Sequence, residues 1–475
     1  MTVRLALSVN GSRLNSSIAQ LAQIGKLPGG GVSRVAFTKE DLLARKLVES
    51  WMREAGMTVR IDAAGNTIGR YPGLREGAAL ATGSHIDTVP TGGHFDGVLG
   101  VLAGIEVVRV LRENGLRLEH AIETIVFTDE ESTVIGCKAM AGNTVNNPEY
   151  YRRSDATSIQ TCLAQIGGDW SKIAEAKRHP KEIAAFVELH VEQGGVLEST
   201  GDCIGVVKGI VGQYRLGVRV TGSPNHAGST PMHARKDALV AASQMVLAVN
   251  KLAVETPGEQ VATVGYLTVW PNATNTVPGK VEFKIDLRDL SETNLEQLLA
   301  KMKLEFQAIA SATQTEIEIT QLLHVQPTLA APKIQNAIVE VCQELGFSYR
   351  HLISRAGHDA QEIGRFTDMG MIFVASRGGI SHAEDEYTSP EQCTQGANAL
   401  LQTFLKLDRL YAAKGDRFMT AEHLKNTPIL SVSRFQEGLA IASRAIAFEA
   451  IALIVKRGAI VVVSALHILC LRKSC

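Results

Sequence analysis

Histidine and carboxylate residues cluster in four short segments of the chain, and each segment directly follows an apolar run. The four segments are Gly83-Ser84-His85-Ile86-Asp87 with the nearby Asp96, then Asp129-Glu130-Glu131, then Glu188–Gln193, and finally the loop that ends at His382. Imidazole and carboxylate groups are the ligands that zinc and related divalent ions take up in proteins. The residue types therefore indicate metal chemistry, with acids available to move protons.

Strands must deliver these segments to one place. The apolar runs 78–84, 122–128, 186–191 and 371–375 each predict a buried strand. Between the first two, apolar residues recur at helical spacing from Val98 to Arg112, which completes a β-α-β unit with parallel strands. Sites in open α/β sheets form outside the carboxyl ends of the strands. We therefore expect the four segments to meet at one edge of a mostly parallel sheet covered by helices.

Each segment alone also allows a simpler interpretation. Asp96-Gly97 is a common turn dipeptide, so the first segment could be a loop with capping residues. The three adjacent acids at 129–131 could form a solvated turn, and His190 and His382 could be structural. Four strand ends that all carry histidine or acid favour a metal site instead, in which one glutamate binds metal and its neighbour transfers protons.

A second pattern interrupts the first between Val211 and His324. Predicted strands cover 211–221, 261–271, 280–289 and 316–324, and predicted helices cover 237–255 and 291–313. The order β-α-β-β-α-β is ferredoxin-like. The α/β pattern then resumes with a helix at 333–345, a strand at 370–375 and a helix at 390–410. We expect a catalytic domain formed by residues 1–210 and 327–413, an inserted domain at 211–326 and an extension at 414–475.

Composition restricts the classes of partner. The 475 residues carry a net charge of −1, and 45% of them are hydrophobic. No long basic run is present, which argues against nucleic acid or an anionic membrane as partner. Seven scattered cysteines without a Cys-x-x-Cys pair, and an N-terminal apolar run too short for a signal peptide, predict a reducing, cytoplasmic location.

The end of the chain is rich in apolar residues. The stretch 439–470 is apolar but contains four charged residues, and its longest apolar part, 458–470, is shorter than the roughly twenty residues that span a bilayer. It could be an amphipathic helix, a hydrophobic interface segment or a tail without function. We expect no function and no membrane span.

These segments together resemble the hydantoinase/carbamoylase family of metal-dependent amidohydrolases, within the dinuclear metallopeptidase superfamily. The resemblance runs from about Asn15 to about Tyr411 and includes Gly29–Arg34 and Asp62–Asn66. It implies a fold like that of dinuclear zinc aminopeptidases, with the inserted domain acting as a lid and dimerisation domain.

The resemblance also implies a ligand set for two divalent ions per subunit, either zinc or manganese, cobalt or nickel. It assigns His85, Asp96 and His190 to one ion, and Glu131 and His382 to the other, with Asp96 bridging both. Glu130 matches the general base, and Asp87 matches the acid that orients His85.

Substrate-binding residues follow from the same resemblance. It implies a homodimer in which His226, Asn275 and Arg288 act across subunits. His226 would stabilise the oxyanion of the tetrahedral intermediate, and Arg288 would bind a substrate carboxylate. Gln193 would hold the polar end of the substrate with Asn275, and His358-Asp359 would play a supporting role. A salt bridge with Asp286 or Asp289 is the alternative for Arg288.

The chain departs from the family pattern at two places. Ser132-Thr133-Val134-Ile135 stands where relatives commonly carry an Arg-Phe pair, and this change bears on packing and substrate preference. Ala383-Glu384-Asp385-Glu386 follows His382, where Ser-Pro before an acidic residue is usual.

The implied function is hydrolysis of the C–N bond of a ureido group in a small carboxylate substrate, with release of ammonia and CO2. An N-carbamoyl-L-amino acid is the expected substrate, and allantoate or ureidoglycolate is the alternative. A metallodipeptidase or a non-catalytic binding protein of the same fold are further alternatives. His190 and the pair Asn275 and Arg288 favour ureido substrates over peptides, and the intact Glu130 argues against a protein that only binds.

Overall fold

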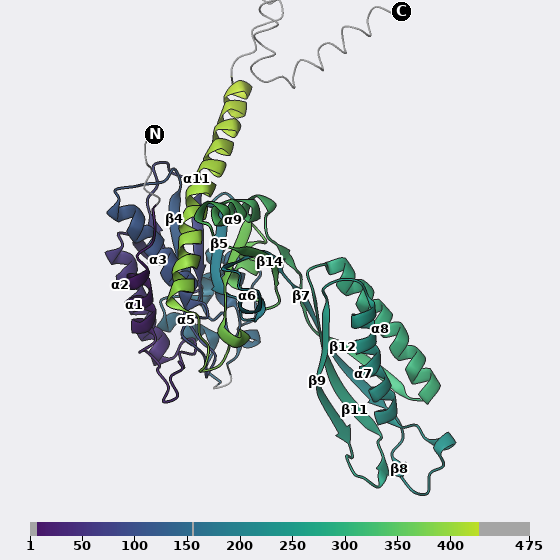
Figure 1. Ribbon diagram of the computed structural model, residues 1–475. Helices are drawn as coiled ribbons and strands as arrows, with labels where there is room; N and C mark the ends of the chain where they lie inside the picture. The colour runs from purple at the N-terminus through teal and green to yellow at the C-terminus, as the bar shows by residue number, and fades with distance from the viewer. Residues whose placement is uncertain (1–6, 154–155, 427–475) are drawn as a thin grey trace, which may run out of the picture. The chain divides into compact units, whose positions relative to one another are not determined.

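The computed structural model describes residues 7–153 and 156–426. The chain divides into two compact units, residues 1–412 and residues 413–475. The described part of the first unit contains a large and a smaller β-sheet, each with its own helices, and a two-stranded ribbon (Figure 1). The expectations for residues 439–470 lie outside the described residues.

The larger sheet has nine strands, and its centre is parallel. The central order is β4 (Ala121–Val126), β3 (Ala79–Ser84), β5 (Ile183–Val191) and β15 (Met369–Val374). Nearly every side chain on these strands is buried, because helices cover both faces. This double burial explains why the strands read as continuous apolar runs rather than as alternating patterns.

The edges of this sheet are largely antiparallel. On one side, β1 (Thr58–Ile61) pairs with β2 (Thr67–Tyr71), and β2 pairs with β4. On the other side, β6 (Ile204–Ile210) is antiparallel to both β15 and β13 (Thr328–Leu329), while β14 (Tyr349–Ser354) is parallel to β6. The sheet is therefore mixed, and the predicted parallel arrangement describes its centre.

Helices form a layer on each face of the large sheet. One face packs against α1 (Gly11–Leu21), α2 (Lys39–Glu54), α3 (Val98–Glu113), α9 (Pro332–Leu345) and the first part of α11 (Pro390–Asn426). The other face packs against α4 (Ile135–Ala141), α6 (Val196–Thr200) and α10 (Asp359–Ile363). Glycines let α3 approach the strands closely, since a Cβ at Gly100 would lie 2.4 Å from the carbonyl oxygen of Leu189.

Short helices and turns fill the connection between β4 and β5. They are η1 (Pro148–Tyr151), α5 (Ile159–Gln165) and η2 (Trp170–Ala176), and they share a small core that includes Tyr151 and Leu163.

The smaller sheet confirms the ferredoxin-like pattern. Its antiparallel strands run in the order β12 (Glu316–Val325), β7 (Gly212–Thr221), β11 (Lys280–Asp289) and β9 (Val261–Trp270). Helices α7 (Ala238–Glu255) and α8 (Glu292–Thr313) pack on one face of it around Met245, Phe283 and Phe306 (Figure 1). We refer to residues 211–326 as the inserted domain.

Among the described residues, α7 is the one helix long and apolar enough to cross a membrane by length and composition. Its buried residues, which include Ala238 and Val249, belong to the core of the inserted domain. They account for the apolar character of this helix.

The inserted domain also carries a small ribbon and joins the large sheet at one point. The ribbon pairs β8 (Asn225–His226) with β10 (Thr276–Val277). The chain leaves the large sheet after Ile210 and returns at Thr328, and these two residues are paired on β6 and β13. The amide of Val211 donates to the carbonyl of Ser354 at 3.0 Å, which fixes the point of departure.

Candidate metal centre and active site

The loop after β3 and the start of α3 carry three of the predicted site residues, His85, Asp87 and Asp96. Gly97 lies between Asp96 and α3 with φ at +66°, a conformation that glycine adopts without strain. A Cβ at this position would lie 2.5 Å from Nε2 of His85. Glycine here therefore lets the His85 ring lie directly against the start of the helix.

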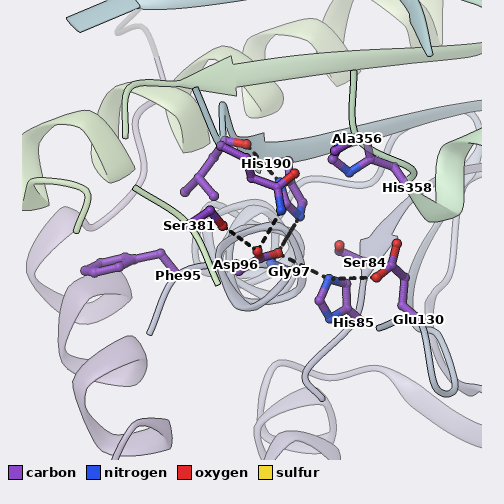
Figure 2. Close-up of polar contacts among 12 residues, drawn as sticks. Ser84, His85, Phe95, Asp96, Gly97, Glu130, His190, Ala356, His358 and Ser381 are labelled. Atoms are coloured by element: carbon purple, nitrogen blue, oxygen red, sulfur yellow. Dashed lines mark hydrogen bonds and ion pairs between the residues drawn. The ribbon is translucent and has the colours of Figure 1, made fainter. Parts of the chain in front are cut away.

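His85, Asp96 and His190 form the first donor cluster. Their donor atoms lie within 4.8 Å of one another, and all three side chains are buried. The Oδ1 atom of Asp96 is 3.4 Å from Nε2 of His85 and 3.2 Å from Nε2 of His190. Figure 2 shows the two imidazole rings converging on the Asp96 carboxylate.

Backbone carbonyls orient both imidazoles. Nδ1 of His85 is 2.9 Å from the carbonyl oxygen of Asp87, and Nδ1 of His190 is 2.9 Å from that of Val191. Because a carbonyl oxygen only accepts hydrogen bonds, each Nδ1 carries a proton, and Nε2 is the atom left to face Asp96. This arrangement is the one that metal-binding histidines use.

The second donor cluster consists of Asp96, Glu131 and His382. Nε2 of His382 lies 3.5 Å from Oδ2 of Asp96 and 3.4 Å from Oε2 of Glu131. His382 has φ at +54°, a left-handed conformation that is uncommon outside glycine and often marks functional positions. Since Asp96 presents one oxygen to each cluster, its carboxylate lies between the two.

The concentration of buried acid at the site favours cations. Burial raises the pKa of Glu131 to about 7, with a further increase from the charge of Asp96. Burial also raises the pKa of Glu130 well above its ordinary value. Burial alone would lower the pKa of His85, but the carboxylates around it, that of Glu130 foremost, raise it instead. The carboxylates thus stabilise a positive charge close to the Nε2 atoms of the histidines. This set of nitrogen and oxygen donors fits divalent metal ions.

Glu130 lies beside the first cluster rather than within it. Its Oε2 atom is 3.6 Å from Nε2 of His85, and Figure 2 shows its side chain beside that ring. Asp129, which connects it to β4, has φ at +57°. This turn directs Glu130 and Glu131 into the same cavity, where one can bind metal and the other can carry a proton.

Asp87 contacts both clusters, but not in the predicted way. Its backbone carbonyl orients His85, whereas its carboxylate Oδ1 is 3.9 Å from Nδ1 of that ring. The other oxygen, Oδ2, accepts the backbone amide of Glu131 at 3.2 Å. The side chain of Asp87 therefore positions Glu131 more directly than it positions His85.

Two residues that the sequence did not single out hold Asp96 in place. Glu386 is buried, and its Oε1 accepts the backbone amides of Phe95 and Asp96, each at 3.0 Å. Ser381 donates its hydroxyl to Oδ2 of Asp96 at 3.0 Å and also contacts Glu386. The sequence signal was weak, because Glu386 stands in an acidic run that is typical of a solvated loop.

Gln193 belongs to the same network. It was predicted to bind substrate, and its Nε2 donates to Oδ2 of Asp96 at 2.7 Å. Its φ is +55°, so the chain turns sharply where β5 ends. In this arrangement the side chain lies at the wall of the site and contacts a candidate ligand.

A buried network behind His190 includes His358 and Glu188. The ring of His358 packs edge-on against that of His190, with centroids 4.5 Å apart, and its Nε2 is 2.8 Å from Oγ of Ser354. Burial, reinforced by His190, lowers the pKa of His358 well below its ordinary value. Glu188 accepts from Oγ of Ser84 at 2.7 Å and from the amide of Ala360 at 2.9 Å. His358 is therefore a neutral imidazole that packs against the ring of His190.

The two clusters open into a cavity of about 350 Å³, and Arg288 lines the same cavity. Its guanidinium donates to Asp286 from Nε at 2.7 Å and from Nη2 at 3.3 Å, and Nη1 donates to the carbonyl of Arg355 at 2.6 Å. The salt bridge considered from sequence is therefore present. Arg288 also lies at the cavity of its own chain, which differs from the prediction that it acts across subunits.

His226 and Asn275 lie elsewhere in the chain. Both are exposed, His226 on β8 and Asn275 directly before β10, and neither is among the residues that line the cavity. Nδ1 of His226 accepts the amides of Gly228 at 3.1 Å and Ser229 at 3.2 Å, so Nε2 carries the proton. The ring is thus set up as a hydrogen-bond donor, and its action on the active site of a second subunit stays a prediction.

Comparisons with known proteins agree with this geometry. Residues 81–406 match the peptidase family M20/M25/M40. The chain is 39% identical to an N-carbamoyl-L-amino acid amidohydrolase from Geobacillus stearothermophilus over 405 residues, which cover 84% of this chain and 99% of the relative. It is 37% identical to an allantoate amidohydrolase from Bacillus subtilis, over 84% of this chain and 98% of that one.

A solved structure is similar in fold as well as in sequence. It is an amidase of the hydantoinase/carbamoylase family from Burkholderia multivorans, with a TM-score of 0.78 and 36% identity over 84% of this chain and 98% of that chain. The chain therefore belongs to the peptidase family M20/M25/M40 and, within it, to the hydantoinase/carbamoylase amidases.

Proposed function

We propose that this protein is a metal-dependent amidohydrolase that cleaves the C–N bond of a ureido group in a small carboxylate substrate, with N-carbamoyl-L-amino acids as the substrate class. One observation carries the proposal. Asp96 joins two donor clusters, and Glu130 and Arg288 line the same cavity. A proton carrier and a carboxylate-binding cation thus lie beside a candidate dinuclear centre.

The five candidate ligands divide between two divalent ions. His85, Asp96 and His190 would hold one ion, and Glu131 and His382 would hold the other, with Asp96 shared. When bound, such ions polarise the substrate carbonyl and make water a stronger nucleophile. Zinc, manganese, cobalt and nickel all accept nitrogen and oxygen donors of this kind, so we leave the metal open.

Glu130 moves the proton in this proposal. It takes a proton from the attacking water and returns it to the leaving nitrogen as the C–N bond breaks. Its buried position raises its pKa above the ordinary value, which suits a group that must both accept and release a proton. The carbamate that is formed decomposes to CO2 and ammonia, and an amino acid remains.

Side chains from both domains hold the substrate. Arg288 binds the carboxylate, for which its guanidinium exchanges part of its contact with Asp286. Gln193 and, from a second subunit, Asn275 hold the remaining polar groups. His226 of a second subunit donates its Nε2 proton to the oxygen of the tetrahedral intermediate, where charge develops.

A substrate panel tests the proposal. Purified protein loaded with Mn²⁺ or Zn²⁺ is assayed for ammonia release from N-carbamoyl-L-amino acids, 3-ureidopropionate, allantoate and ureidoglycolate, and for amine release from dipeptides. We expect the highest kcat/KM with an N-carbamoyl-L-amino acid and complete loss of activity with a chelator.

The other outcomes decide between the alternatives. A preference for allantoate or ureidoglycolate would change the substrate but keep the reaction. Cleavage of dipeptides alone would indicate a metallodipeptidase, and metal binding without any turnover would indicate a binding protein. A cytoplasmic location is part of the same proposal, because the cysteines are scattered along the sequence without a Cys-x-x-Cys pair.

A further inference from the structure

A recess of about 150 Å³ adjoins the catalytic cavity on the side of Arg288. Five residues line both spaces, namely Val134, Gln213, Arg288, Gly357 and His358. Cys137, Val211 and Val325 line the recess but not the catalytic cavity. A molecule whose carboxylate lies on Arg288 therefore has an additional space beside it.

Val134 stands between the two spaces in an unusual conformation. Its φ is +50° and its ψ is +31°, which is the left-handed region that β-branched residues rarely adopt. Three hydrogen bonds hold it there. Its amide donates to the carbonyl of Asp129 at 2.7 Å, and its own carbonyl accepts from the Cys137 thiol at 3.3 Å and from the Lys138 amide at 3.1 Å. Strained backbone of this kind concentrates at ligand sites.

The same loop carries the candidate base. Glu130 follows Asp129 directly, so the hydrogen bond between Asp129 and Val134 closes a short loop around it. Val134 is therefore fixed relative to Glu130. A substrate group that contacts Val134 is thereby positioned relative to the reacting C–N bond.

The opposite wall of the recess is fixed as well. The side-chain amide of Gln361 donates to the carbonyls of Val211 at 3.0 Å and Gln326 at 3.2 Å. These contacts tie the base of the inserted domain to the catalytic domain at the point where β7 begins and β12 ends. The recess is thus built into the structure, with walls that hydrogen bonds hold in place.

We propose that this recess receives the side chain of the substrate amino acid, and that it selects ureido acids with an aliphatic side chain. The inference rests on the proposed function, since it places the carboxylate on Arg288 at the junction of the two spaces. Val134, Cys137, Val211 and Val325 give the recess an apolar surface, which favours an alkyl group over water.

Charged residues line the recess too, and their signs are mixed. Lys138 and Arg355 are cations, and Glu362 is an anion whose carboxylate accepts from Asn143 at 2.8 Å. An acidic side chain would find the two cations there but also Glu362. We favour an aliphatic group because of the apolar surface. The test also measures N-carbamoyl-L-aspartate, which carries an acidic side chain.

The test compares kcat/KM for N-carbamoyl-L-leucine with that for N-carbamoylglycine. In the wild type we expect leucine to exceed glycine by about tenfold or more, because a methylene group in an apolar pocket typically contributes about 10- to 200-fold. Val325→Phe fills the recess from a residue that does not line the catalytic cavity. We expect this variant to lower the ratio by about tenfold or more.

A control separates filling of the recess from a general effect on β12. Leu322→Phe enlarges an exposed side chain on the same strand and should leave the ratio at its wild-type value. If Val325→Phe does not fold, Val325→Ala enlarges the recess without overpacking. It should then raise the preference for N-carbamoyl-L-phenylalanine over N-carbamoyl-L-leucine.

The failures of the two proposals can be distinguished. No turnover of any ureido acid by the wild type would overturn the proposed function. Turnover of N-carbamoylglycine and N-carbamoyl-L-leucine with equal kcat/KM would overturn the recess alone. A higher kcat/KM for N-carbamoyl-L-aspartate than for N-carbamoyl-L-leucine would also overturn it. So would a Val325→Phe variant in which kcat/KM falls equally for N-carbamoyl-L-leucine and N-carbamoylglycine.

Discussion

Glu130 and Glu131 are adjacent in sequence but have different surroundings. Glu131 faces His382 and donates its backbone amide to the carboxylate of Asp87, whereas Glu130 faces His85. Asp129, which precedes both, has a left-handed conformation, and both side chains line the same cavity. One position therefore belongs to the second donor cluster, and the other lies beside the first cluster.

Substitution of Glu130 tests this difference. Glu130→Gln removes the proton carrier but keeps the shape of the side chain, so we expect both metal ions to remain and kcat to fall by about 10²- to 10⁴-fold. Glu131→Gln is the matched variant and should lose metal on dialysis. Metal content by elemental analysis and initial rates check both, and normal activity in Glu130→Gln would show that another group carries the proton.

His226 is the residue whose role depends on a second subunit. His226→Ala removes a donor aimed at developing charge, so we expect kcat to fall by about 10²- to 10³-fold with an unchanged melting temperature. His233→Ala is the control, because His233 is also exposed in the inserted domain.

A heterodimer of His226→Ala with Glu130→Gln locates the action of His226. If the residue acts across subunits, one of the two sites in the heterodimer has both groups intact, and about half of the wild-type activity returns. If it acts within its own subunit, each site keeps one defect. Activity no higher than that of the two homodimeric variants would then rule out action of His226 across subunits.

The sequence predicted the chemistry of these residues better than their contacts. Residue type indicated metal chemistry, the resemblance to the family assigned His85, Asp96 and His190 to one ion, and the structure brings these three residues together. Spacing could not indicate that Arg288 donates to the carbonyl of Arg355, or that the buried Glu386 accepts the amide of Asp96. Both facts depend on contacts between segments far apart in the chain, which local patterns do not encode.

At the scale of elements, one carboxylate joins two loops. Glu386 lies in the loop between β15 and α11, and it accepts two backbone amides from the loop between β3 and α3. These amides belong to Phe95 and Asp96, at the start of α3. The position of the shared candidate ligand therefore depends on a residue that is 290 positions away in sequence.

Removal of this carboxylate should weaken metal binding. Glu386→Ala leaves the amides of Phe95 and Asp96 without their acceptor, and loss of such outer contacts typically lowers metal affinity by about 10- to 100-fold. Metal titration of the chelator-treated protein measures the effect. Asp385→Ala, at the exposed neighbouring position, should bind as the wild type does, and equal affinities in all three proteins would contradict the assignment.

The elements themselves were largely predictable, and the pairing at the sheet edges was not. Long apolar runs such as β5 and β15 are unambiguous because both faces are covered. The short strands β13 and β14 carry little periodicity, and nothing in their sequences indicates which strand they pair with or in which direction. Val134 is a further example, since a β-branched residue in the left-handed region runs against its own local preference.

At the scale of the whole molecule, α11 is tied to the large sheet through Asp408. This carboxylate accepts the amides of Glu119 at 3.0 Å and His120 at 2.9 Å, and it lies 2.8 Å from Nδ1 of His120. Burial alone would raise the pKa of Asp408, but these hydrogen bonds hold it below its ordinary value. The charged form therefore stabilises the fold.

This shift gives a stability effect with a defined sign. A lowered folded-state pKa stabilises the protein above the unfolded value of about 3.9, and the effect disappears as the pH falls through the folded-state pKa. Asp408→Asn should therefore melt below the wild type at pH 7, with a difference that narrows at acidic pH. Glu305→Gln, on the exposed side of α8, should show no such difference. A constant difference at all pH values would mean that the charge is not responsible.

The pairing of Ile210 with Thr328 makes the large sheet tolerant of changes in the length of the inserted domain. Between these partners lie 117 residues (328 − 210 − 1), yet to the large sheet they count as a single turn between two antiparallel strands. The free-energy cost of closing a loop grows only with the logarithm of its length, by about 0.6 kcal/mol for each doubling. The stability of the β6–β13 pairing therefore depends little on the number of residues between the two strands. A module with two ends this close can be enlarged, shortened or exchanged while the order of the strands beneath it stays the same.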